Sequence, residues 1–370
     1  MKTQMSSLEM HYLIRELQQL INSKVDKIYN PSRKEILIQL YVAGIGKKIL
    51  RINSPEFFYL TTKKEEAEKP SGFCMFLRKM LGNSRIRSIR QLEFERIIEI
   101  EFETKQGTYS LIAEMFSKGN IILLTDNKII SAAENQEWSD RTIKPKEKYK
   151  YPRKKYNFLK ISEGELKQAV EESEKQSLVK TLALDIGLGG IYAEELCLIS
   201  VIDKNKKKLD DSELRRLYDG IESMKSKKLE PSIFLKNNEV VDVTPFKLNH
   251  YSDCIQEIRD SYNEAMDSVF TKVVAKEVKE QKSKYDKQIE KFEKMVEEQQ
   301  LKVDEFKSEE GGNQKKGELI YENYLLFSEV LKFLSESRKK HSAEELKKML
   351  KNFDTVKEFD EKKGEITFEI

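Results

Sequence analysis

A long, highly charged segment near the end of the chain carries a regular apolar stripe, and this stripe most constrains the fold. From about residue 263 the sequence is helical in character. The members of the stripe alternate between spacings of four and three, with one polar exception: Tyr285, Ile289, Phe292, Val296, Gln299, Val303 and Phe306. Such heptad spacing is typical of a coiled-coil seam. We therefore expect an arm that projects from the body of the protein.

The stripe is interrupted once and then resumes. We expect Gly311-Gly312-Asn313 to stop the helix, after which the spacing returns at Ile320, Tyr324, Phe327, Leu331 and Leu334. Two seams on either side of a Gly-Gly break predict an antiparallel helical hairpin. A third short helix is expected at Ala343–Met349, and Gly364–Ile370 resembles a strand with no partner nearby. A hairpin within one chain and a dimeric coiled coil share this seam, so the oligomeric state stays open.

The first part of the chain predicts an α+β fold with an antiparallel sheet. Ser6 can cap a helix whose apolar residues recur at helical spacing up to Ile21. A second helix is expected at Phe73–Leu81. Within Arg96–Glu103, apolar residues alternate strictly with glutamate, which is the pattern of a strand with one buried face. Further strands follow, so residues up to about 135 form a sheet domain.

Residues 141–160 form a basic and aromatic segment. Nine lysines and arginines face a single acid, Glu147, and four aromatic residues are interleaved: Tyr149, Tyr151, Tyr156 and Phe158. Positive charge attracts a polyanion, and tyrosine rings can stack on unpaired bases. A solvated linker would carry the same charge, and the two interpretations weigh equally on composition alone. A pure linker has little use for four aromatics, which favours RNA binding.

A glycine-rich turn, Gly187-Leu188-Gly189-Gly190, separates two expected helices. Backbone N–H groups at such a turn, entering a helix, can bind a phosphate. Helix-hairpin-helix modules hold a nucleic-acid backbone in this way without reading bases. An ordinary turn that needs glycine at positive φ explains the same sequence and is favoured when the turn is taken alone. Lysines at 204 and 206–208 favour the binding interpretation.

Composition and cysteine usage exclude several classes of protein. The 370 residues include 67 basic and 64 acidic side chains, so the net charge of +3 points to no partner. Three separated cysteines make neither a disulfide framework nor a zinc site, which favours a reducing cytosol. The apolar runs are too short to span a membrane, and the amphipathic start does not resemble a signal peptide. We expect a cytoplasmic protein without a membrane partner.

No catalytic constellation is visible in the sequence. His11, His250 and His341 lie on separate segments and form no ligand set. Neither a phosphate-binding loop nor a dinucleotide fingerprint occurs. Glu95-Arg96, at the start of the alternating strand, is an acid-base pair of a kind that usually decorates a surface. We therefore expect no metal, no cofactor and no enzymatic activity.

Several stretches, taken in order, resemble the NFACT family, the NEMF/RqcH-type factors of ribosome quality control. They are Met5–Glu9 with Glu16-Leu17; Gly72–Lys79, similar to an F-x-x-x-L-R-K helix; Phe94–Ile98, similar to a G-x-D-R-I-V strand; Glu114–Phe116 with Gly119–Leu123; Tyr149–Pro152; Asn263–Asp267; and Lys316–Ile320. The likeness covers almost the whole chain. It implies an α+β fold in which an antiparallel-sheet domain, similar to that of DNA glycosylases, precedes a helix-hairpin-helix module and a long antiparallel coiled-coil arm.

The resemblance also implies domain boundaries. We expect the family's N-terminal domain at residues 1–160, the helix-hairpin-helix module at 161–235, and a strand with a connector returning to the first domain at 236–265. The coiled-coil hairpin and middle helices would occupy 266–350, and 351–370 would begin a further region that is cut short. The family's C-terminal RNA-binding domain is missing, so we expect a shortened form.

The resemblance assigns residues to RNA. Glu95-Arg96 takes the place of an Asp-Arg pair associated with tRNA, with one more methylene of reach, and Arg78 and Lys79 are assigned to tRNA on the same basis. The basic segment and the glycine-rich turn supply the residues expected to bind the RNA backbone: Lys148, Tyr149, Lys150, Arg153, Lys154, Lys155, Gly187, Gly189 and Gly190.

For function, the resemblance implies a factor that binds the large ribosomal subunit while it holds an obstructed peptidyl-tRNA. Related proteins recruit aminoacyl-tRNA and support untemplated C-terminal tailing, with alanine in prokaryotic and archaeal cases. The ribosome itself performs the chemistry. The arm is expected to reach rRNA and stalk-base proteins, and a ubiquitin ligase is a further partner only in eukaryotic relatives.

Other interpretations remain for comparison. A coiled-coil scaffold predicts dimerisation and no affinity for RNA. A nucleic-acid-binding protein without a ribosomal role predicts affinity for nucleic acid. A DNA glycosylase of the similar fold needs an N-terminal proline followed by glutamate and a cysteine-rich zinc finger, but Lys2 and Thr3 stand here and the cysteines are scattered. An adhesin needs a signal peptide or an anchor, and the sequence favours neither.

Overall fold

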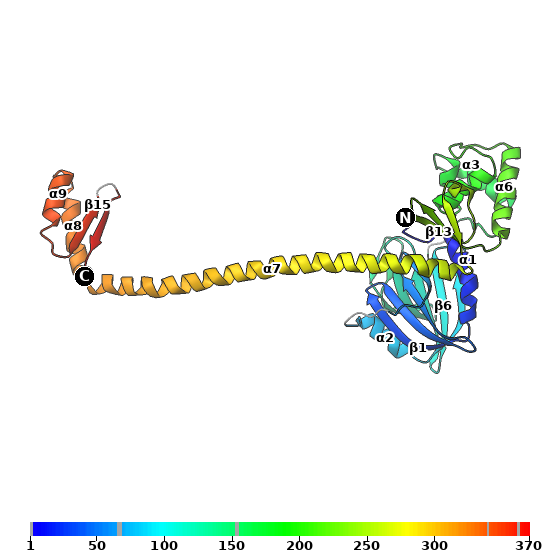
Figure 1. Ribbon diagram of the computed structural model, residues 1–370, viewed down its shortest axis with the longest axis horizontal. Coiled ribbons are helices and arrows are strands. Elements are labelled where there is room, and N and C mark those ends of the chain that lie inside the picture. The colour runs from blue at the N-terminus through cyan, green and yellow to red at the C-terminus, as the bar shows by residue number, and fades with distance from the viewer. Residues whose placement is uncertain (1–2, 65–68, 152–154, 339, 361–362) are drawn as a thin grey trace. The chain divides into compact units, whose positions relative to one another are not determined.

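The chain divides into two compact units, Met1–Glu277 and Val278–Ile370. The computed structural model describes residues 3–64, 69–151, 155–338, 340–360 and 363–370, except for the side chains of 272–286 and 343. The first unit contains a large sheet and a helical module, and the second contains most of a long helix followed by two helices and a strand pair (Figure 1).

A nine-stranded antiparallel sheet forms the base of the first unit. Its strands are β1 (Lys24–Ser32), β2 (Glu35–Val42), β3 (Gly46–Asn53), β4 (Phe57–Thr61), β5 (Arg85–Gln91), β6 (Ile97–Thr104), β7 (Gly107–Glu114), β8 (Asn120–Thr125) and β9 (Lys128–Ala132). They lie in the order β4-β3-β2-β1-β5-β6-β7-β8-β9, so the neighbours β1 and β5 join two meanders. The expected class, α+β with an antiparallel sheet, is confirmed in these broad terms.

The alternating strand behaves as its sequence predicts. On β6, Ile98, Ile100 and Phe102 are buried, while Glu103 is exposed. These side chains join a core that takes residues from β1 to β8 and from the helices α1 (Ser7–Leu17) and α2 (Gly72–Leu81). The other face of β6 to β9 has a smaller core of its own, which includes Ile97 and Tyr149. Both faces of this half of the sheet are therefore covered.

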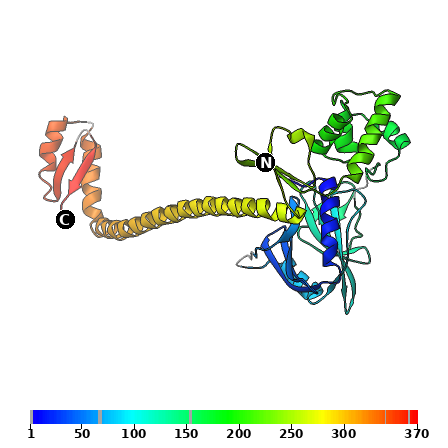
Figure 2. The same cartoon turned by 45° about the vertical axis from the view of Figure 1, so that its right-hand side comes forward.

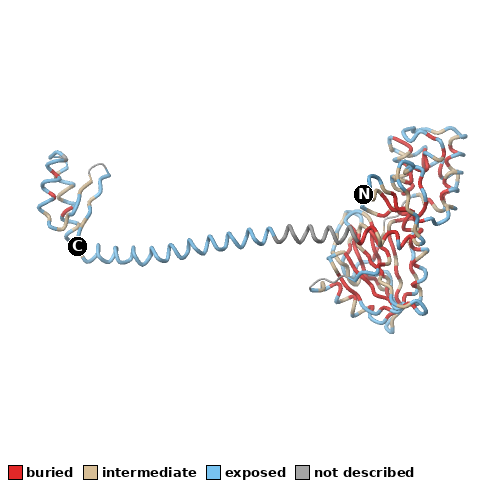
Figure 3. Tube along the Cα trace, in the orientation of Figure 1, coloured by how far each residue is buried: buried red, intermediate tan, exposed pale blue. Residues whose placement is uncertain are grey.

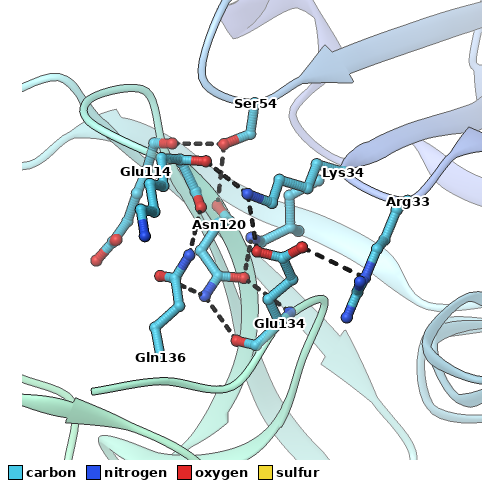
Figure 4. Close-up of polar contacts among 10 residues, drawn as sticks. Arg33, Lys34, Ser54, Glu114, Asn120, Glu134 and Gln136 are labelled. Atoms are coloured by element: carbon cyan, nitrogen blue, oxygen red, sulfur yellow. Dashed lines mark hydrogen bonds and ion pairs between the residues drawn. The ribbon is translucent and has the colours of Figure 1, made fainter.

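A polar cluster holds the two meanders together at one end of the sheet (Figure 4). Ser54, between β3 and β4, donates its hydroxyl to the carbonyl oxygen of Glu114 at 2.5 Å. A Cβ at Gly119, where φ is +64°, would lie 2.4 Å from Ser54 Oγ, so the close approach requires glycine. Lys34 Nζ lies 2.8 Å from Glu134 Oε2 and thus ties the β1–β2 turn to the segment after β9. The sheet consequently folds back over its own core.

Helix α1 begins with a complete capping box. Ser6 Oγ accepts from the backbone N–H of Glu9, and the Glu9 carboxylate accepts from the N–H of Ser6 at 2.8 Å. At its other end, Glu16 accepts from the backbone N–H groups of Tyr262 at 2.7 Å and Asn263 at 2.9 Å. The Glu16 carboxylate therefore caps the helix α7 (Tyr262–Glu322), where an anion is favoured by the helix dipole.

The helical module has a core separate from that of the sheet. Its helices are α3 (Glu163–Glu172), α4 (Leu178–Lys180), the π-helical turn η2 (Thr181–Asp185), α5 (Gly190–Ile199) and α6 (Asp211–Ser226). Leu8 and Tyr12 of α1 join this core. Since other residues of α1 join the sheet core, this helix packs on both sides.

A three-stranded sheet follows the helical module, with the order β13-β12-β14. Its strands are β12 (Ser232–Lys236), β13 (Glu239–Thr244) and β14 (Ile255–Ile258), and the short helix η3 (Asn249–Tyr251) lies between the last two. Strand pairing thus starts at Ser232, inside the range expected for the helical module.

The predicted helix stop at Gly311-Gly312-Asn313 is wrong. Helix α7 runs without interruption to Glu322, and neither glycine adopts a positive φ. A glycine inside a helix costs about 1 kcal/mol relative to alanine, but without a proline or a left-handed cap the flanking Glu, Gln and Lys residues continue the helix. The break lies at Asn323 instead, after which α8 (Tyr324–Ser337) begins.

The predicted antiparallel hairpin is not formed by the described residues. From Ile289 onward the seam residues of α7 remain open to solvent, with Phe292 61%, Val296 64% and Phe306 67% exposed (Figure 3), whereas the side chain of Tyr285 lies outside the described part. The chain continues instead into α8, α9 (Ala343–Leu350) and the strands β15 (Val356–Asp360) and β16 (Glu365–Phe368). Because β16 pairs with β15, the expectation of an unpartnered terminal strand is also wrong.

The ion pairs of Glu134 predict a specific pH dependence of stability. The hydrogen bond from Lys34 is the main reason that the pKa of Glu134 lies below its ordinary value of 4.5. A lowered carboxyl pKa adds stability above the ordinary value, and this stability is lost as pH falls through the folded-state pKa. We expect Glu134→Gln to lower the free energy of unfolding by about 1 kcal/mol at pH 7. Urea titrations should show the difference vanishing at acid pH, and a constant difference would contradict this assignment.

The continuous α7 predicts the effect of removing its glycines. We expect Gly311→Ala and Gly312→Ala each to stabilise the helix by about 1 kcal/mol, because no atom lies within 4 Å of the added Cβ. Circular dichroism should show equal or greater helix content and a higher melting temperature for the second unit. A hairpin turn at these positions would instead be disrupted by both changes.

Candidate functional site

A pocket of about 560 Å³ unites two features that the sequence analysis treated separately, Arg96 and the glycine-rich turn. Its walls come from the first turn of α1, the start of β6, the turn before α5, and β13 with η3. The polar and glycine residues that line it are Gln4, Ser6, Ser7, Glu9, Arg96, Gly187, Gly189, Gly190, Asp242 and Tyr251. The sheet, the helical module and the small sheet therefore meet at one concave site.

Arg96 is the cation of this pocket. It lies directly before β6, is partly buried, and donates from Nη1 to Gln4 Oε1 at 2.9 Å. Burial lowers the pKa of Arg96, while the carboxylates of Glu95 and Glu9 oppose that shift. A guanidinium has five N–H donors in a fixed fork, so the bond to Gln4 leaves others for a phosphate or a base.

The glycine-rich turn has the backbone conformation that its composition suggests. Gly187 and Gly189 have φ values of +80° and +87°, which only glycine adopts readily. Gly189 is the N-cap of α5 and lies so close to α1 that a Cβ there would be 3.3 Å from Ser6 Cβ. Among the described residues no side chain caps α5, so its first N–H groups are available at the pocket.

Two carboxylates in the pocket were missed by the sequence analysis. Glu9 is fully buried and accepts from the Tyr192 hydroxyl at 2.7 Å. Asp242 accepts from the Tyr251 hydroxyl at 2.8 Å, and burial is the first reason that the pKa of Tyr251 is raised. Since Glu9 lies in the segment Met5–Glu9 that resembles the family, that match was the available signal.

A bridging side chain holds Arg96 in position. Gln91 Nε2 donates to the backbone oxygens of Ser7 at 3.0 Å and Glu95 at 2.9 Å. It thereby fixes the turn before β6 against the first turn of α1. Glu95 lies within this turn and is only 8% exposed. Of the pair Glu95-Arg96 that the resemblance assigned to tRNA, only Arg96 therefore lines the pocket, whereas the Glu95 side chain is buried.

Arg78 and Lys79 do not belong to this pocket. Both lie on α2, at the opposite end of the first unit from α3 and α6 (Figures 1 and 2). Arg78 Nε donates to the carbonyl oxygen of Ile28 at 2.7 Å, and Lys79 is exposed. Arg78 lines a second cavity, of about 440 Å³, together with Lys27 and Lys64.

Tyr149 is a correction to the expected RNA-binding residues, because its ring is buried. Its hydroxyl donates to Glu114 Oε1 at 2.9 Å, and burial, followed by the charge of Glu114, raises its pKa. Arg141 pairs with the same carboxylate at 2.6 and 3.2 Å and lies over Trp138. Tyr149 therefore cannot stack on a base. Tyr149 alternates with the exposed Lys148 and Lys150, and this strand-like alternation could have indicated that its ring is buried.

The rest of the basic segment is exposed but divided. Lys148 and Lys150 face solvent, and Lys155 forms an ion pair with Glu172. Arg153 and Lys154 lie outside the described residues. Phe158 is buried in the core of the helical module, so this aromatic residue is also unavailable for stacking.

Two further observations concern metals and membranes. Among the described residues, no group of three or more His, Cys, Asp and Glu side chains is arranged to hold a metal ion. No helix in the described part of the chain has both the length and the apolar character needed to cross a membrane.

A family model described as "NFACT N-terminal and middle domains" matches residues 6–363. The chain is 34% identical over 367 residues to "Archaeal Rqc2 homolog aRqcH" of Methanocaldococcus jannaschii, covering 95% of this chain and 55% of that relative. It is 32% identical to "Rqc2 homolog RqcH" of Streptococcus pneumoniae, covering 53% and 38%, respectively. It is 24% identical to "Ribosome quality control complex subunit 2" of Saccharomyces cerevisiae, covering 89% and 39%. The chain thus spans from 38% to 55% of the length of these relatives.

Solved structures show a similar fold. The fibrinogen binding protein from Staphylococcus aureus has a TM-score of 0.58 at 24% identity, covering 71% of this chain and 97% of that chain. The N-terminal part of the fibronectin/fibrinogen-binding protein from Streptococcus suis has a TM-score of 0.57 at 24% identity, covering 72% and 99%. At this identity the likeness concerns the fold alone.

The burial of Tyr149 predicts that removing its hydroxyl lowers stability without changing RNA affinity. Tyr149→Phe removes the hydrogen bond to the Glu114 carboxylate and is expected to lower the free energy of unfolding by about 2 kcal/mol. Affinity for tRNA, measured by fluorescence anisotropy, should stay unchanged. Tyr109→Phe is the matched control, since Tyr109 is buried as well. A loss of RNA affinity without a loss of stability would instead place the Tyr149 hydroxyl in contact with RNA and contradict its bond to Glu114.

Proposed function

The chain belongs to the NFACT family, and on that premise we propose that it acts in ribosome quality control by binding tRNA on the large ribosomal subunit. The names of its relatives in an archaeon, a bacterium and a yeast support this role. The single observation that carries the tRNA assignment is the pocket where Arg96 and the glycine-rich turn meet.

The chemistry of the pocket suits a nucleotide with an unpaired base. The Arg96 fork binds a phosphate or the O6 and N7 atoms of guanine, and the free N–H groups of α5 suit a phosphate. Asp242, which lines the pocket, is suited to accept a hydrogen bond from a base amino or imino group, whereas the fully buried Glu9 contributes only its negative charge. RNA recognition commonly uses such splayed bases in loops, and tRNA presents several of them.

In this proposal the protein is not an enzyme. It holds tRNA while the ribosome's peptidyl-transfer centre adds residues, alanine being the expected one, to the obstructed nascent chain. The glycine-rich turn and its flanking helices serve as the helix-hairpin-helix module. Its partners are then peptidyl-tRNA, aminoacyl-tRNA, and the rRNA and stalk-base proteins of the large subunit, and its place of action is the cytoplasm. A ubiquitin ligase joins only if the source is eukaryotic.

A substitution in the pocket separates tRNA recruitment from subunit binding. We expect Arg96→Gln to weaken tRNA binding at least tenfold, which is about 1.4 kcal/mol. Co-sedimentation with large subunits carrying peptidyl-tRNA on a sucrose gradient should persist, because other surfaces contribute to it.

The matched control is Arg90→Gln. Arg90 is exposed on β5, outside the pocket, and pairs with Glu99, so the change removes the same charge from the same sheet. Equal weakening by both variants would contradict a role for the pocket. Absence of the unmodified protein from the large-subunit fraction at low salt would reject the ribosomal role itself.

A coiled-coil scaffold is the second candidate, and the exposed seam of α7 favours it. Phe292, Val296 and Phe306 would bury a large apolar area if a partner helix packed against them. This candidate predicts self-association by analytical ultracentrifugation and no binding of tRNA. The absence of tRNA binding would be opposite to the result expected if the Arg96 pocket binds tRNA.

A further inference from the structure

A row of exposed side chains crosses four strands of the large sheet. Arg85 on β5 lies opposite Lys24 on β1, Lys24 lies opposite Tyr41 on β2, and Tyr41 lies opposite Lys47 on β3. Residues directly opposite one another project from the same face of a sheet. All four are exposed, Tyr41 by 55%. With strands about 4.8 Å apart, the row is roughly 14 Å long.

The charge of this row is only partly balanced by neighbouring acids. Lys47 Nζ lies 3.8 Å from Asp26, whose carboxylate also accepts from Gln39 at 2.5 Å. Arg85 Nη1 donates to the backbone oxygen of Asn22, which carries no charge.

Glu103 is the residue opposite Arg85 on the other side, and it is already paired with Arg87. The row therefore keeps a local excess of positive charge in a chain whose net charge is only +3.

The pairing of Lys24 with Arg85 is unfavourable in the free protein. Like charges directly opposite each other destabilise an antiparallel pair. A surface chosen for stability alone would place an acid or a neutral residue there. The juxtaposition points to an anionic ligand that compensates the repulsion when it binds.

A cavity lined by three cations and by Asp26 lies near the row in sequence, beside α2. The residues after Lys24 line the cavity of about 440 Å³ that also contains Lys27, Lys64 and Arg78. Arg78 is held there by its bond to the carbonyl oxygen of Ile28. The cavity and the Arg96 pocket share no lining residue, so this is a separate site.

We propose that the row Arg85-Lys24-Tyr41-Lys47 is a second RNA-binding surface, in which the cations bind backbone phosphates and Tyr41 stacks on an unpaired base. The proposal rests on the proposed function, since it assigns a further surface to an RNA partner. An exposed ring between two lysines matches the arrangement by which proteins bind single-stranded nucleic acid. An acidic protein segment would use the cations but would have no need for the ring.

The test uses the full chain and a labelled oligouridylate of roughly 12 nucleotides, a length that a small binding surface accommodates. We expect the triple variant Lys24→Gln, Lys47→Gln and Arg85→Gln to lose at least tenfold in affinity at about 0.1 M salt. The slope of log affinity against log salt should fall by roughly 2, since each phosphate contact on a single strand contributes about 0.7. Its melting temperature should not decrease, because the variant relieves the repulsion between Lys24 and Arg85.

The matched control is Lys105→Gln, Lys118→Gln and Lys128→Gln, which removes the same charge from exposed positions in two turns and on β9 of the same sheet. Tyr41→Ser should weaken binding without changing the salt slope, and Tyr41→Phe should retain binding. Binding of the oligouridylate is measured independently of sedimentation with ribosomal subunits. A failure of the second RNA surface can therefore be told apart from a failure of the proposed ribosomal function.

Three results would overturn the second RNA surface. The row variant binds as tightly as the unmodified protein, or the control variant loses as much affinity as the row variant. The third is that polyglutamate of equal charge displaces the labelled oligouridylate as well as unlabelled RNA does, while Tyr41→Ser has no effect on affinity. In that case the partner is an acidic protein.

Discussion

The arrangement of the first unit depends on one buried carboxylate, that of Glu9. A carboxylate removed from water is costly unless hydrogen bonds compensate it. Here the N–H of Ser6 and the hydroxyl of Tyr192 provide such bonds, at 2.8 and 2.7 Å. The first of these partners caps α1 and the second belongs to α5, so docking of the helical module helps to offset the cost of burial. The bond to Tyr192 also connects α5, which follows the glycine-rich turn, to α1 at the pocket.

The same helix makes further connections at helical spacing. Tyr12, three residues after Glu9, donates its hydroxyl to the backbone oxygen of Lys227 at 2.9 Å, just after α6. Glu16, four residues later, caps α7. Positions separated by three and four residues lie on one side of a helix. One face of α1 therefore holds the module and the start of α7, while other residues of the helix join the sheet core.

Local patterns in the sequence predicted local structure well, and failed where distant residues decide. The alternation in β6 and the capping of α1 needed only neighbours, and both are present. Tyr149 was misjudged because its partners, Glu114 and Arg141, come from another strand and another turn. The glycines in α7 were misjudged because a propensity cost of about 1 kcal/mol is small beside the cooperative gain of a long helix. Arg96 and the turn at Gly187 were each recognised, but only the fold shows that they share a pocket.

The carboxylates around Arg96 have a consequence for selectivity. A pocket lined by cations alone would accept any phosphate, including the backbone of a duplex. The negative charges of Glu9 and Asp242 repel a phosphate that neither Arg96 nor the N–H groups of α5 bind, and Asp242 at the pocket wall favours a ligand that presents hydrogen-bond donors. In a duplex the donors on the Watson–Crick edges of the bases are already paired. In the proposed function, the two negative charges therefore disfavour double-helical RNA relative to an unpaired nucleotide.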